Sequence, residues 1–385
     1  MATVLKDILL KCETVGASDI HLSPGMPPFF RVKGSLRPDP GFQALTREEI
    51  VGLAGELLFR MSGKDSESLE LLLQRRGSID GACTSISGGR YRFNIFQCQS
   101  MVLPERRHGE NFLSLGIAIR LLESRFRSLK ELGLPERLQS FCGLKDGLVI
   151  VSGPTGSGKS TTLATLLDEI NRSRSGHIIT IEDPVEYVHL PVKSLVHQRQ
   201  IGIDAADFNS ALVDSLREDP DIILVGEIRE LETIRTAITA AETGHLVFTT
   251  LHAGDCVGAV ERFVSVFPAG EQEAVRRQLS LVLRGIVAQR LLLSERRGEE
   301  ARRLPVCEIL VNTPAVANLI ASGKAAQIYS AMETGSVWGM QTLEQDLARL
   351  VLSGDISQQA ALSLARNPAV FRNRIRNGRQ EGEWR

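Results

Sequence analysis

The sequence predicts an α/β protein: a small α+β domain of mostly antiparallel strands, then a core built on a parallel sheet, then a mainly helical C-terminal part. In residues 1–125, short alternating stretches are separated by turn residues, which is typical of antiparallel strands. From about residue 140, apolar runs alternate with helical patterns, which is typical of a parallel sheet covered by helices. A glycine-rich stretch at 153–160 joins one such run to a helix.

The composition is that of a globular protein with two or three domains. The chain has 385 residues, of which 43% are hydrophobic and 24% charged. A net charge of −1 gives no overall attraction to nucleic acid or to anionic membranes. The six cysteines are scattered and form no C-x-x-C pair, which argues against a zinc site or a disulfide framework and is typical of a reducing cytosol.

The first domain is expected to span residues 1–125. Helical spacing covers Val4–Val15, and a second helix is expected to begin at Thr46, with Glu49 completing a capping box. The strand at 90–96 places Arg90, Arg92 and Asn94 on one face, which is equally consistent with a solvated face and a functional one. The other strands are predicted at 18–22, 29–32, 78–84 and 115–122, with a loop at 102–111.

A linker is expected at 126–139, because Gly133 and Pro135 interrupt its pattern. The core should then span 140–300, with buried strands at His177–Ile181, Asp221–Val225 and Leu246–Leu251. Helices are expected between these strands at 208–217 and 232–242 and after them at 257–266 and 271–293.

A C-terminal, mainly helical subdomain is expected over 301–371, starting with a strand at 305–311. Its helices are expected at 315–322, 340–352 and 357–365. The tail at 372–385 is rich in arginine and poor in apolar residues, so disorder is predicted there.

The stretch at 153–160 has the spacing of a phosphate-binding P-loop. Its glycines allow successive N–H groups to point at a phosphate, and the following helix adds the partial positive charge of its N-terminus. We expect Lys159 to reach the β- and γ-phosphates and the Ser160 hydroxyl to ligate Mg²⁺. A chance glycine-rich turn before a helix is the alternative, and the flanking strand argues against it. The expected nucleotide-binding residues are Gly153, Pro154, Thr155, Gly156, Ser157, Gly158, Lys159, Ser160 and Thr161.

Acidic side chains follow two of the buried strands, at the edge where open parallel sheets bind ligands. Glu227 stands where the Walker B acid belongs, but Gly226 precedes it where an aspartate is usual. The metal shell would then need other carboxylates, and Glu182, Asp183 and Glu186 are the candidates, although three carboxylates in five positions also fit a solvated turn.

Two histidines lie at the two ends of the strand at 246–251. His252, at the carboxyl end, is placed to sense the γ-phosphate, whereas His245 follows a helix stop at Gly244 and fits a structural cap equally well. At about 3.3 Å per residue along a strand, the two histidines lie too far apart to share a metal.

Four stretches resemble the Walker A, Asp box, Walker B and His box of the type II/IV secretion ATPases, most of all the PilT/PilU-type retraction ATPases of type IV pili. They are Gly153–Thr161, Ile179–His189, Leu216–Arg229 and Gly244–Ala253. Supporting matches lie at 18–22, 90–94, 289–291 and 339–342, so the likeness covers roughly residues 1–365.

The resemblance implies a PAS-like N-terminal domain joined by a flexible linker to a RecA-like P-loop ATPase core, in homohexamers that bind ATP and Mg²⁺ between domains and subunits. It implies that Glu186 is the catalytic glutamate that polarises water, that Glu227 holds Mg²⁺, and that His245 and His252 form the His box. The arginines that reach the phosphates match Arg90, Arg92 and Arg120. Which of them acts as the finger stays open, because Gln97-Cys98 and the longer segment at 102–111 depart from the family pattern.

The function implied is an ATP hydrolase that drives pilus retraction, and hence twitching motility, by coupling hydrolysis to domain motion. The implied partners are copies of the chain itself, an inner-membrane pilus platform protein and a paralogous retraction ATPase, with no nucleic acid. The implied location is the cytoplasm, peripheral to the inner membrane.

Two alternatives stay open: an assembly ATPase of a pilus or type II secretion system, and an accessory PilU-like regulatory ATPase that depends on a partner ring. Assembly relatives carry a tetracysteine motif, and the segment from Ser294 to Pro305 has no cysteine, which favours retraction. The accessory alternative is favoured by Ala317, which replaces the arginine of the family's AIRNL motif at Ala315–Leu319.

Overall fold

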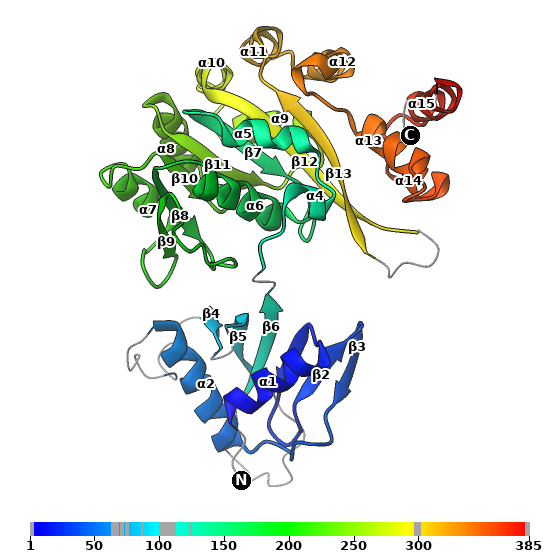
Figure 1. Cartoon of the computed structure of the whole chain (residues 1–385). Helices are drawn as coiled ribbons and strands as arrows, with labels where there is room; N and C mark the ends of the chain where they lie inside the picture. The colour runs from blue at the N-terminus through cyan, green and yellow to red at the C-terminus, as the bar shows by residue number, and fades with distance from the viewer. Residues whose placement is uncertain are drawn as a thin grey trace. The chain divides into compact units, whose positions relative to one another are not determined.

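A computed structural model of the chain describes residues 4–62, 69, 73, 77–85, 88–99, 113–122, 125–295 and 302–381. The chain divides into two units, one of Met1–Arg125 with Pro184–Val188 and one of Phe126–Asp183 with His189–Arg385. Each unit has its own sheet and its own hydrophobic core (Figure 1). The loop expected at 102–111 lies outside the described residues.

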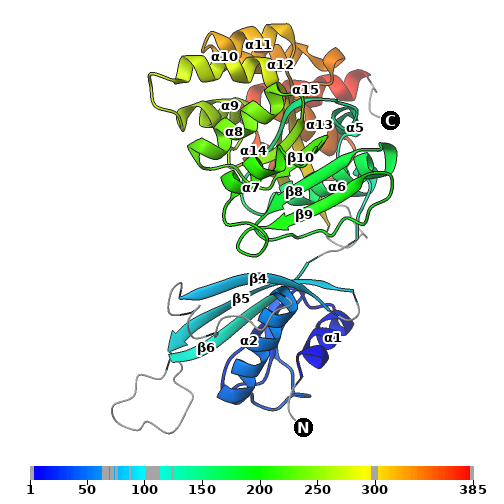
Figure 2. The same ribbon diagram turned by 90° about the vertical axis from the view of Figure 1, so that its left-hand side faces the viewer.

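The first unit is built on a six-stranded antiparallel sheet with the strand order β3-β2-β1-β6-β5-β4. Helices α1 and α2 cover one face of it (Figure 2). Along β5 the side chains of Tyr91, Phe93 and Ile95 are buried, as the alternation in the sequence predicts. The elements are α1 (Leu5–Val15), β1 (Asp19–Leu22), β2 (Phe29–Val32), β3 (Ser35–Pro38), α2 (Arg47–Ser62), β4 (Ser78–Thr84), β5 (Arg90–Gln99) and β6 (Leu113–Leu122).

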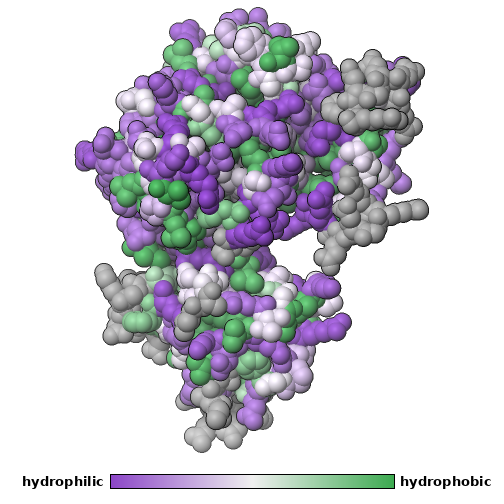
Figure 3. Space-filling model, in the orientation of Figure 1, coloured by the Kyte–Doolittle hydropathy of each residue, from purple (hydrophilic) through white to green (hydrophobic). Residues whose placement is uncertain are grey.

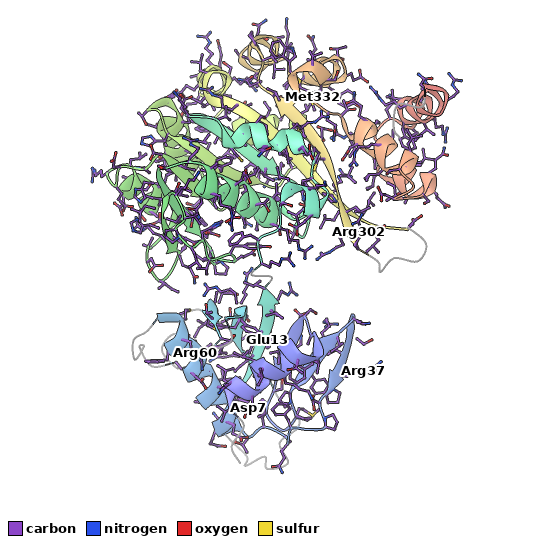
Figure 4. All side chains as sticks on the ribbon, in the orientation of Figure 1. Asp7, Glu13, Arg37, Arg60, Arg302 and Met332 are labelled. Carbon is purple, nitrogen blue, oxygen red and sulfur yellow. The ribbon has the colours of Figure 1, made fainter. Side chains whose placement is uncertain are left out.

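Helix α1 is also tied to the sheet by polar contacts. The Tyr91 hydroxyl lies 2.7 Å from Glu13 Oε1 and 3.1 Å from the main-chain oxygen of Leu9. Glu13, on α1 (Figure 4), also accepts a hydrogen bond from Ser85 at 3.1 Å. The buried phenol therefore has polar partners within an otherwise apolar core.

The second unit is built on a seven-stranded sheet with the order β13-β12-β7-β11-β10-β8-β9. Hydrophobic clusters lie on both faces: α6 packs with Val149 and Val151, and α8 to α10 pack with Leu148 and Ile150. The elements that carry the sheet are β7 (Gly147–Ser152), α6 (Lys159–Ser173), β8 (His177–Glu182), β9 (Leu195–Gln200), α7 (Phe208–Ser215), β10 (Ile222–Val225), α8 (Leu231–Glu242), β11 (Leu246–Leu251), α9 (Cys256–Ser265), α10 (Gln272–Val282), β12 (Leu283–Leu293) and β13 (Arg303–Val311).

The helix expected over 271–293 is wrong in its second half. Only α10 is helical, and β12 follows it at once, parallel to β7 and antiparallel to β13. Because β12 is covered on both faces, its apolar residues do not alternate with polar ones, and no period of two marks the strand in the sequence. Gly285 marks the strand: a Cβ there would lie 2.5 Å from the Phe141 ring.

Part of the stretch expected to be a linker is folded onto the second unit. Helix α4 (Leu129–Leu132), the 3₁₀ turn η1 (Glu136–Leu138) and α5 (Gln139–Cys142) form there. Leu129, Leu134 and Leu138 are buried in the same hydrophobic cluster as Val149 and Val151.

The C-terminal region is helical, and its own small core holds it to β13. Met332, on α12 (Figure 4), is fully buried. The elements are α11 (Pro314–Ala321), η2 (Ala325–Gln327), α12 (Ile328–Thr334), η3 (Ser336–Trp338), α13 (Leu343–Leu352), α14 (Gln358–Leu364) and α15 (Pro368–Glu381).

The disorder predicted for the tail is wrong for residues 372–381, which belong to α15. Phe371 and Ile375, four residues apart and therefore on one face of the helix, are buried in the cluster that contains Leu343 and Leu347. The composition of this segment did not reveal the helix, because two apolar residues at helical spacing suffice to dock a helix on an existing core. Residues 382–385 lie outside the described part of the chain.

The face of the molecule drawn in Figure 3 is mostly hydrophilic, with apolar residues scattered over it. Leu190, Leu281 and Val337 are among the most exposed large apolar residues of the described chain. Among the described residues, no helix combines the length and the apolar character that crossing a bilayer demands.

Candidate nucleotide site

Three glycines shape the loop between β7 and α6. Gly156 and Gly158 have φ angles of 78° and 88°, a left-handed conformation that favours glycine. Gly153 is required for space as well, because a Cβ there would lie 2.3 Å from the main-chain oxygen of Gln289. The backbone therefore turns as the P-loop spacing predicts, and α6 begins at Lys159.

A buried glutamine clamps this loop. Gln289 Oε1 accepts a hydrogen bond from Thr162 Oγ1 at 2.7 Å, and Gln289 Nε2 donates to the main-chain oxygen of Ser157 at 2.8 Å. Gln289 lies on β12, next to β7 in the sheet. We did not predict it as a site residue, and the match to the family at 289–291 was the signal that could have found it.

Lys159 is positioned to bind phosphate. Its Nζ donates to the main-chain oxygens of Gly153 at 2.9 Å and Pro154 at 3.1 Å, so its charge lies inside the loop. Burial lowers the pKa of Lys159, and the charge of Glu227 opposes that shift. Ser157 Oγ is buried and has no hydrogen-bond partner among the described residues. A ready donor and a free hydroxyl in a cradle of main-chain N–H groups fit a nucleotide phosphate.

The strand order brings the other chemical groups to the same edge. Strands β7, β11, β10 and β8 are consecutive parallel neighbours, with Leu251 paired to Ser152 and Val225 paired to both Thr249 and Ile181. The residues that follow them therefore lie in one row: the P-loop after β7, His252 after β11, Glu227 after β10, and Glu182 at the end of β8.

His252 and Glu227 are in direct contact. His252 Nε2 lies 3.0 Å from Glu227 Oε1, and Arg229 also pairs with this carboxylate. Burial and the charge of Lys159 lower the pKa of His252, against the opposing charge of Glu227. The ring is therefore mainly neutral near pH 7, and Nε2 is the ring nitrogen that faces the carboxylate.

Two hydroxyls hold the loops that carry this pair. Ser152 Oγ donates to the main-chain oxygen of Ala253 at 2.9 Å and accepts from the Ala253 N–H at 3.0 Å. Thr250 Oγ1 donates to the main-chain oxygen of Gly226 at 2.6 Å. The position of Gly226 is tight, since a Cβ there would lie 3.2 Å from the main-chain oxygen of Ile181.

The acidic cluster at 182–186 is divided between the two units. Glu182 Oε1 accepts hydrogen bonds from Thr180 Oγ1 at 2.7 Å and from Gln198 Nε2 at 3.2 Å. Asp183 is exposed and directly follows the same strand. Glu186 is half-buried and groups with the first unit, so its role as the catalytic glutamate stays a prediction.

The three candidate arginines share one face of the first sheet. Arg92 on β5 and Arg120 on β6 are directly opposite each other, and Arg90 lies two residues from Arg92. Arg120 donates to Asp19 at 2.7 Å, while Arg92 lies 4.0 Å from Asp80. Arg90 donates to Thr84 Oγ1 at 3.2 Å.

Asp19 organises this face, and we did not predict its role. It also lies 3.7 Å from Arg31, directly across on β2. Burial raises the pKa of Asp19, but the hydrogen bonds from Ser18 and Arg120 and the charges of Arg120 and Arg31 outweigh it and lower the pKa below its usual range. The carboxylate is therefore ionised and keeps the guanidinium groups on the sheet face.

His245 does not join the site. Its Nδ1 contacts the main-chain oxygen of Ala240 at 2.9 Å and Thr243 Oγ1 at 3.1 Å, at the end of α8. It precedes β11, whereas His252 follows it, so the two lie at opposite edges of the sheet. The structural cap is the interpretation that this geometry supports.

The comparisons with known proteins agree with this arrangement. The family model described as "Type II/IV secretion system protein" matches residues 98–362. The chain belongs to this family of secretion ATPases. It is an ATPase of the family and a homologue of pilus retraction ATPases.

Two curated relatives are the type IV pilus retraction ATPase PilT and the type IV pilus ATPase PilU, both of Pseudomonas aeruginosa. PilT is 42% identical over 92% of this chain and 96% of its own length, and PilU is 36% identical over 94% and 89%. The crystal structure of the pilus retraction motor PilT with bound ADP matches with a TM-score of 0.82 at 40% identity, covering 95% of this chain and 98% of that chain. These matches confirm the predicted family, fold class and enzyme class.

Proposed function

We propose that the protein is a homohexameric motor that couples ATP hydrolysis to the retraction of a type IV pilus. The observation that carries the proposal is the row of P-loop, His252 and Glu227 at one edge of the second sheet, with His252 Nε2 3.0 Å from Glu227. Such a row supplies a phosphate cradle, a metal ligand and a polar group that can respond to the γ-phosphate.

Mg²⁺ would be held by Ser160 and Glu227, and it would neutralise charge on the β- and γ-phosphates. Ser160 is exposed in the first turn of α6, and Glu227 follows β10 two strands away. Glu182 and Asp183 are the further carboxylates available at this edge. The oxygen-only chemistry of these side chains suits Mg²⁺.

The remaining steps belong to the chain's own residues. Lys159 would move from the main-chain oxygens it now binds to the phosphates. Glu186 would orient and polarise the attacking water. His252 would respond to the γ-phosphate and act on Glu227 through their direct contact. Arg90, Arg92 and Arg120 would stabilise the charge that develops on the transferred phosphoryl group.

The partners we propose are other copies of the chain and an inner-membrane pilus platform protein, with the motor in the cytoplasm against that membrane. Support comes from the similarity of the chain to PilT and PilU, which are ATPases of type IV pili.

A second candidate is an accessory ATPase that acts with a paralogous retraction ring. Ala317 favours it, since it stands on α11 where the family motif has an arginine. The similarity to PilU is consistent with it as well.

Steady-state ATP hydrolysis by the purified chain tests the proposal. Lys159→Ala and Glu186→Gln should each lower kcat by roughly 100-fold or more, because each removes a group needed in the transition state. Lys145→Ala, at an exposed lysine before β7, is the matched control and should leave kcat unchanged. Full turnover in Lys159→Ala would defeat the enzymatic role.

Twitching of a strain that carries only this protein, with and without a paralogous retraction ATPase, separates the two candidates. Retraction in the absence of the paralogue supports the motor. Retraction only in its presence supports the accessory role.

A further inference from the structure

The segment that carries His252 ends at two carboxylates that share the first turn of α9. Asp255 caps the helix, and its Oδ1 accepts the N–H of Gly258 at 2.6 Å. Glu308, on β13, accepts the N–H of Cys256 through Oε1 at 2.8 Å. The start of α9, just beyond His252, is therefore fixed by an acidic pair drawn from two distant parts of the chain.

One arginine bridges these two carboxylates. Arg366, in the corner between α14 and α15, places Nη2 2.9 Å from Glu308 Oε2 and 3.3 Å from Asp255 Oδ2. The Glu308 side chain is only 1% exposed, and burial raises its pKa while Arg366 opposes the shift. A carboxylate so deeply buried needs a partner, and Arg366 compensates it.

The backbone of Arg366 is itself held in place. The fully buried Glu344 of α13 accepts the N–H groups of Arg366 at 2.9 Å and Asn367 at 3.0 Å through Oε1. The hydroxyl of Tyr329, on α12, donates to the other oxygen of the same carboxylate. Contacts from α12 and α13 thus set where the guanidinium of Arg366 can reach.

The other end of the His252 segment is anchored beside the P-loop. Ser152, the residue before Gly153, exchanges two hydrogen bonds with Ala253. Arg290 donates to the main-chain oxygen of Gly254 at 3.3 Å. Residues 252–255 are therefore held between the phosphate loop and the α14–α15 corner, and His252 meets Glu227 from this segment.

We propose that Arg366 is a positioning residue for the ATP site: by clamping Asp255 and Glu308 it fixes the start of α9 and holds His252 against Glu227. Position matters because a misplaced catalytic group loses much of its effect. The C-terminal helices thereby contribute to the geometry of the nucleotide site. The inference rests on the proposed role of His252 in hydrolysis. The alternative is that Arg366 only stabilises the α14–α15 corner and does not affect His252.

Arg366→Gln, Arg366→Lys and the neutral pair Glu308→Gln with Arg366→Gln are the test variants. The pair avoids leaving Glu308 buried and unpaired, so its melting temperature should stay within about 3 °C of the wild type. Arg372→Gln, at an exposed arginine of α15, is the matched control. We expect kcat of Arg366→Gln and of the neutral pair to fall about tenfold with little change in KM, as for other residues that orient a catalytic group. Arg366→Lys should recover part of the loss.

A double-mutant cycle of Arg366→Gln with His252→Asn distinguishes a residue that positions His252 from one that only stabilises the α14–α15 corner. If Arg366 acts through His252, Arg366→Gln should lower kcat much less in the His252→Asn background than in the wild type. Equal fold losses in both backgrounds, or an unchanged kcat in the folded neutral pair, would overturn the inference. If the wild-type chain does not hydrolyse ATP, that result would instead contradict the proposed function.

Discussion

Single residues in the nucleotide site act mainly through space and charge. Gly153 illustrates space: the P-loop must pass close to β12, and the main-chain oxygen of Gln289 occupies the volume that a Cβ would need. The φ of Gly153 is 150°, a value that residues with a side chain rarely adopt. The glycine thus lets the phosphate loop be clamped by Gln289.

Gly153→Ala should therefore weaken ATP binding by roughly 5- to 150-fold, since steric overlap with the main chain costs roughly 1–3 kcal/mol. Titration with a fluorescent ATP analogue measures the effect. Gly270→Ala, where a Cβ meets no atom within 4 Å, is the control and should bind as the wild type does. Equal affinity of the two variants would contradict the crowding argument.

His189 illustrates charge. It ends the Asp-box segment, is 7% exposed, and its Nδ1 has no hydrogen-bond partner among the described residues. Its ring lies 4.6 Å from the Phe126 ring, centroid to centroid. Burial lowers its pKa to about 4, with the charge of Asp168 opposing the shift.

The pKa of His189 is lower in the folded chain than in the unfolded one, so folding favours the neutral ring. Above pH 6.5 the ring is neutral in both states, and no stability is lost to its protonation. As the pH falls from about 6.5 towards 4, the unfolded chain takes up a proton that the folded chain does not, so the free energy of unfolding should fall by up to about 3 kcal/mol. Urea unfolding across this range measures it. His189→Gln should make the free energy of unfolding less dependent on pH in this range. An identical pH dependence in both proteins would contradict the assigned role of His189.

At the level of elements, the docking of α15 depends on two side chains. Phe371 is fully buried and Ile375 is 4% exposed, while the rest of the helix is largely polar. Isolated helices of this length are marginal in water, so packing must supply the stability.

Phe371→Ala should release α15, because removing a buried aromatic ring costs about 3–5 kcal/mol. Hydrogen exchange of the amides in 368–381 should become fast while that of the β7 amides stays slow. Asn373→Ala, at an exposed position of the same helix, should leave both unchanged. Protection of α15 that survives Phe371→Ala would show that other contacts hold it.

The strands of the second sheet differ in how far they could be predicted. Strands β7, β8, β10 and β11 are short apolar runs bounded by glycine or polar residues, and each was recognised. Strand β12 follows α10 without a break, and β9 at the sheet edge mixes polar and apolar residues. Neither of these two strands was predicted. Local patterns identify a strand where apolar and polar residues alternate, or where turn residues bound a short apolar run, and neither holds for β12 or β9.

At the level of the whole molecule, the proposed hexamer makes each ATP site depend on more than one subunit. Head-to-tail contacts between identical chains close into rings, in which a defective subunit affects its neighbours.

Mixtures of wild type and Lys159→Ala should therefore lose ATPase activity faster than in proportion to the mutant fraction, falling below about half at an equal ratio. Mixtures with Lys145→Ala test for dilution effects and should keep full activity. A strictly proportional loss with Lys159→Ala would indicate that the subunits work independently.

The sequence by itself determined the P-loop, the acids and histidine at the carboxyl ends of the strands, and the family, because these features lie within short stretches whose spacing is visible. Tertiary structure alone decided which groups meet. Gln289 contacts Thr162 across 127 positions, and Arg366 reaches Glu308 across 58. Asp19 joins Arg120 across 101 positions. Strand order and helix docking set such contacts, and local spacing does not encode them, since it reflects only neighbours along the chain.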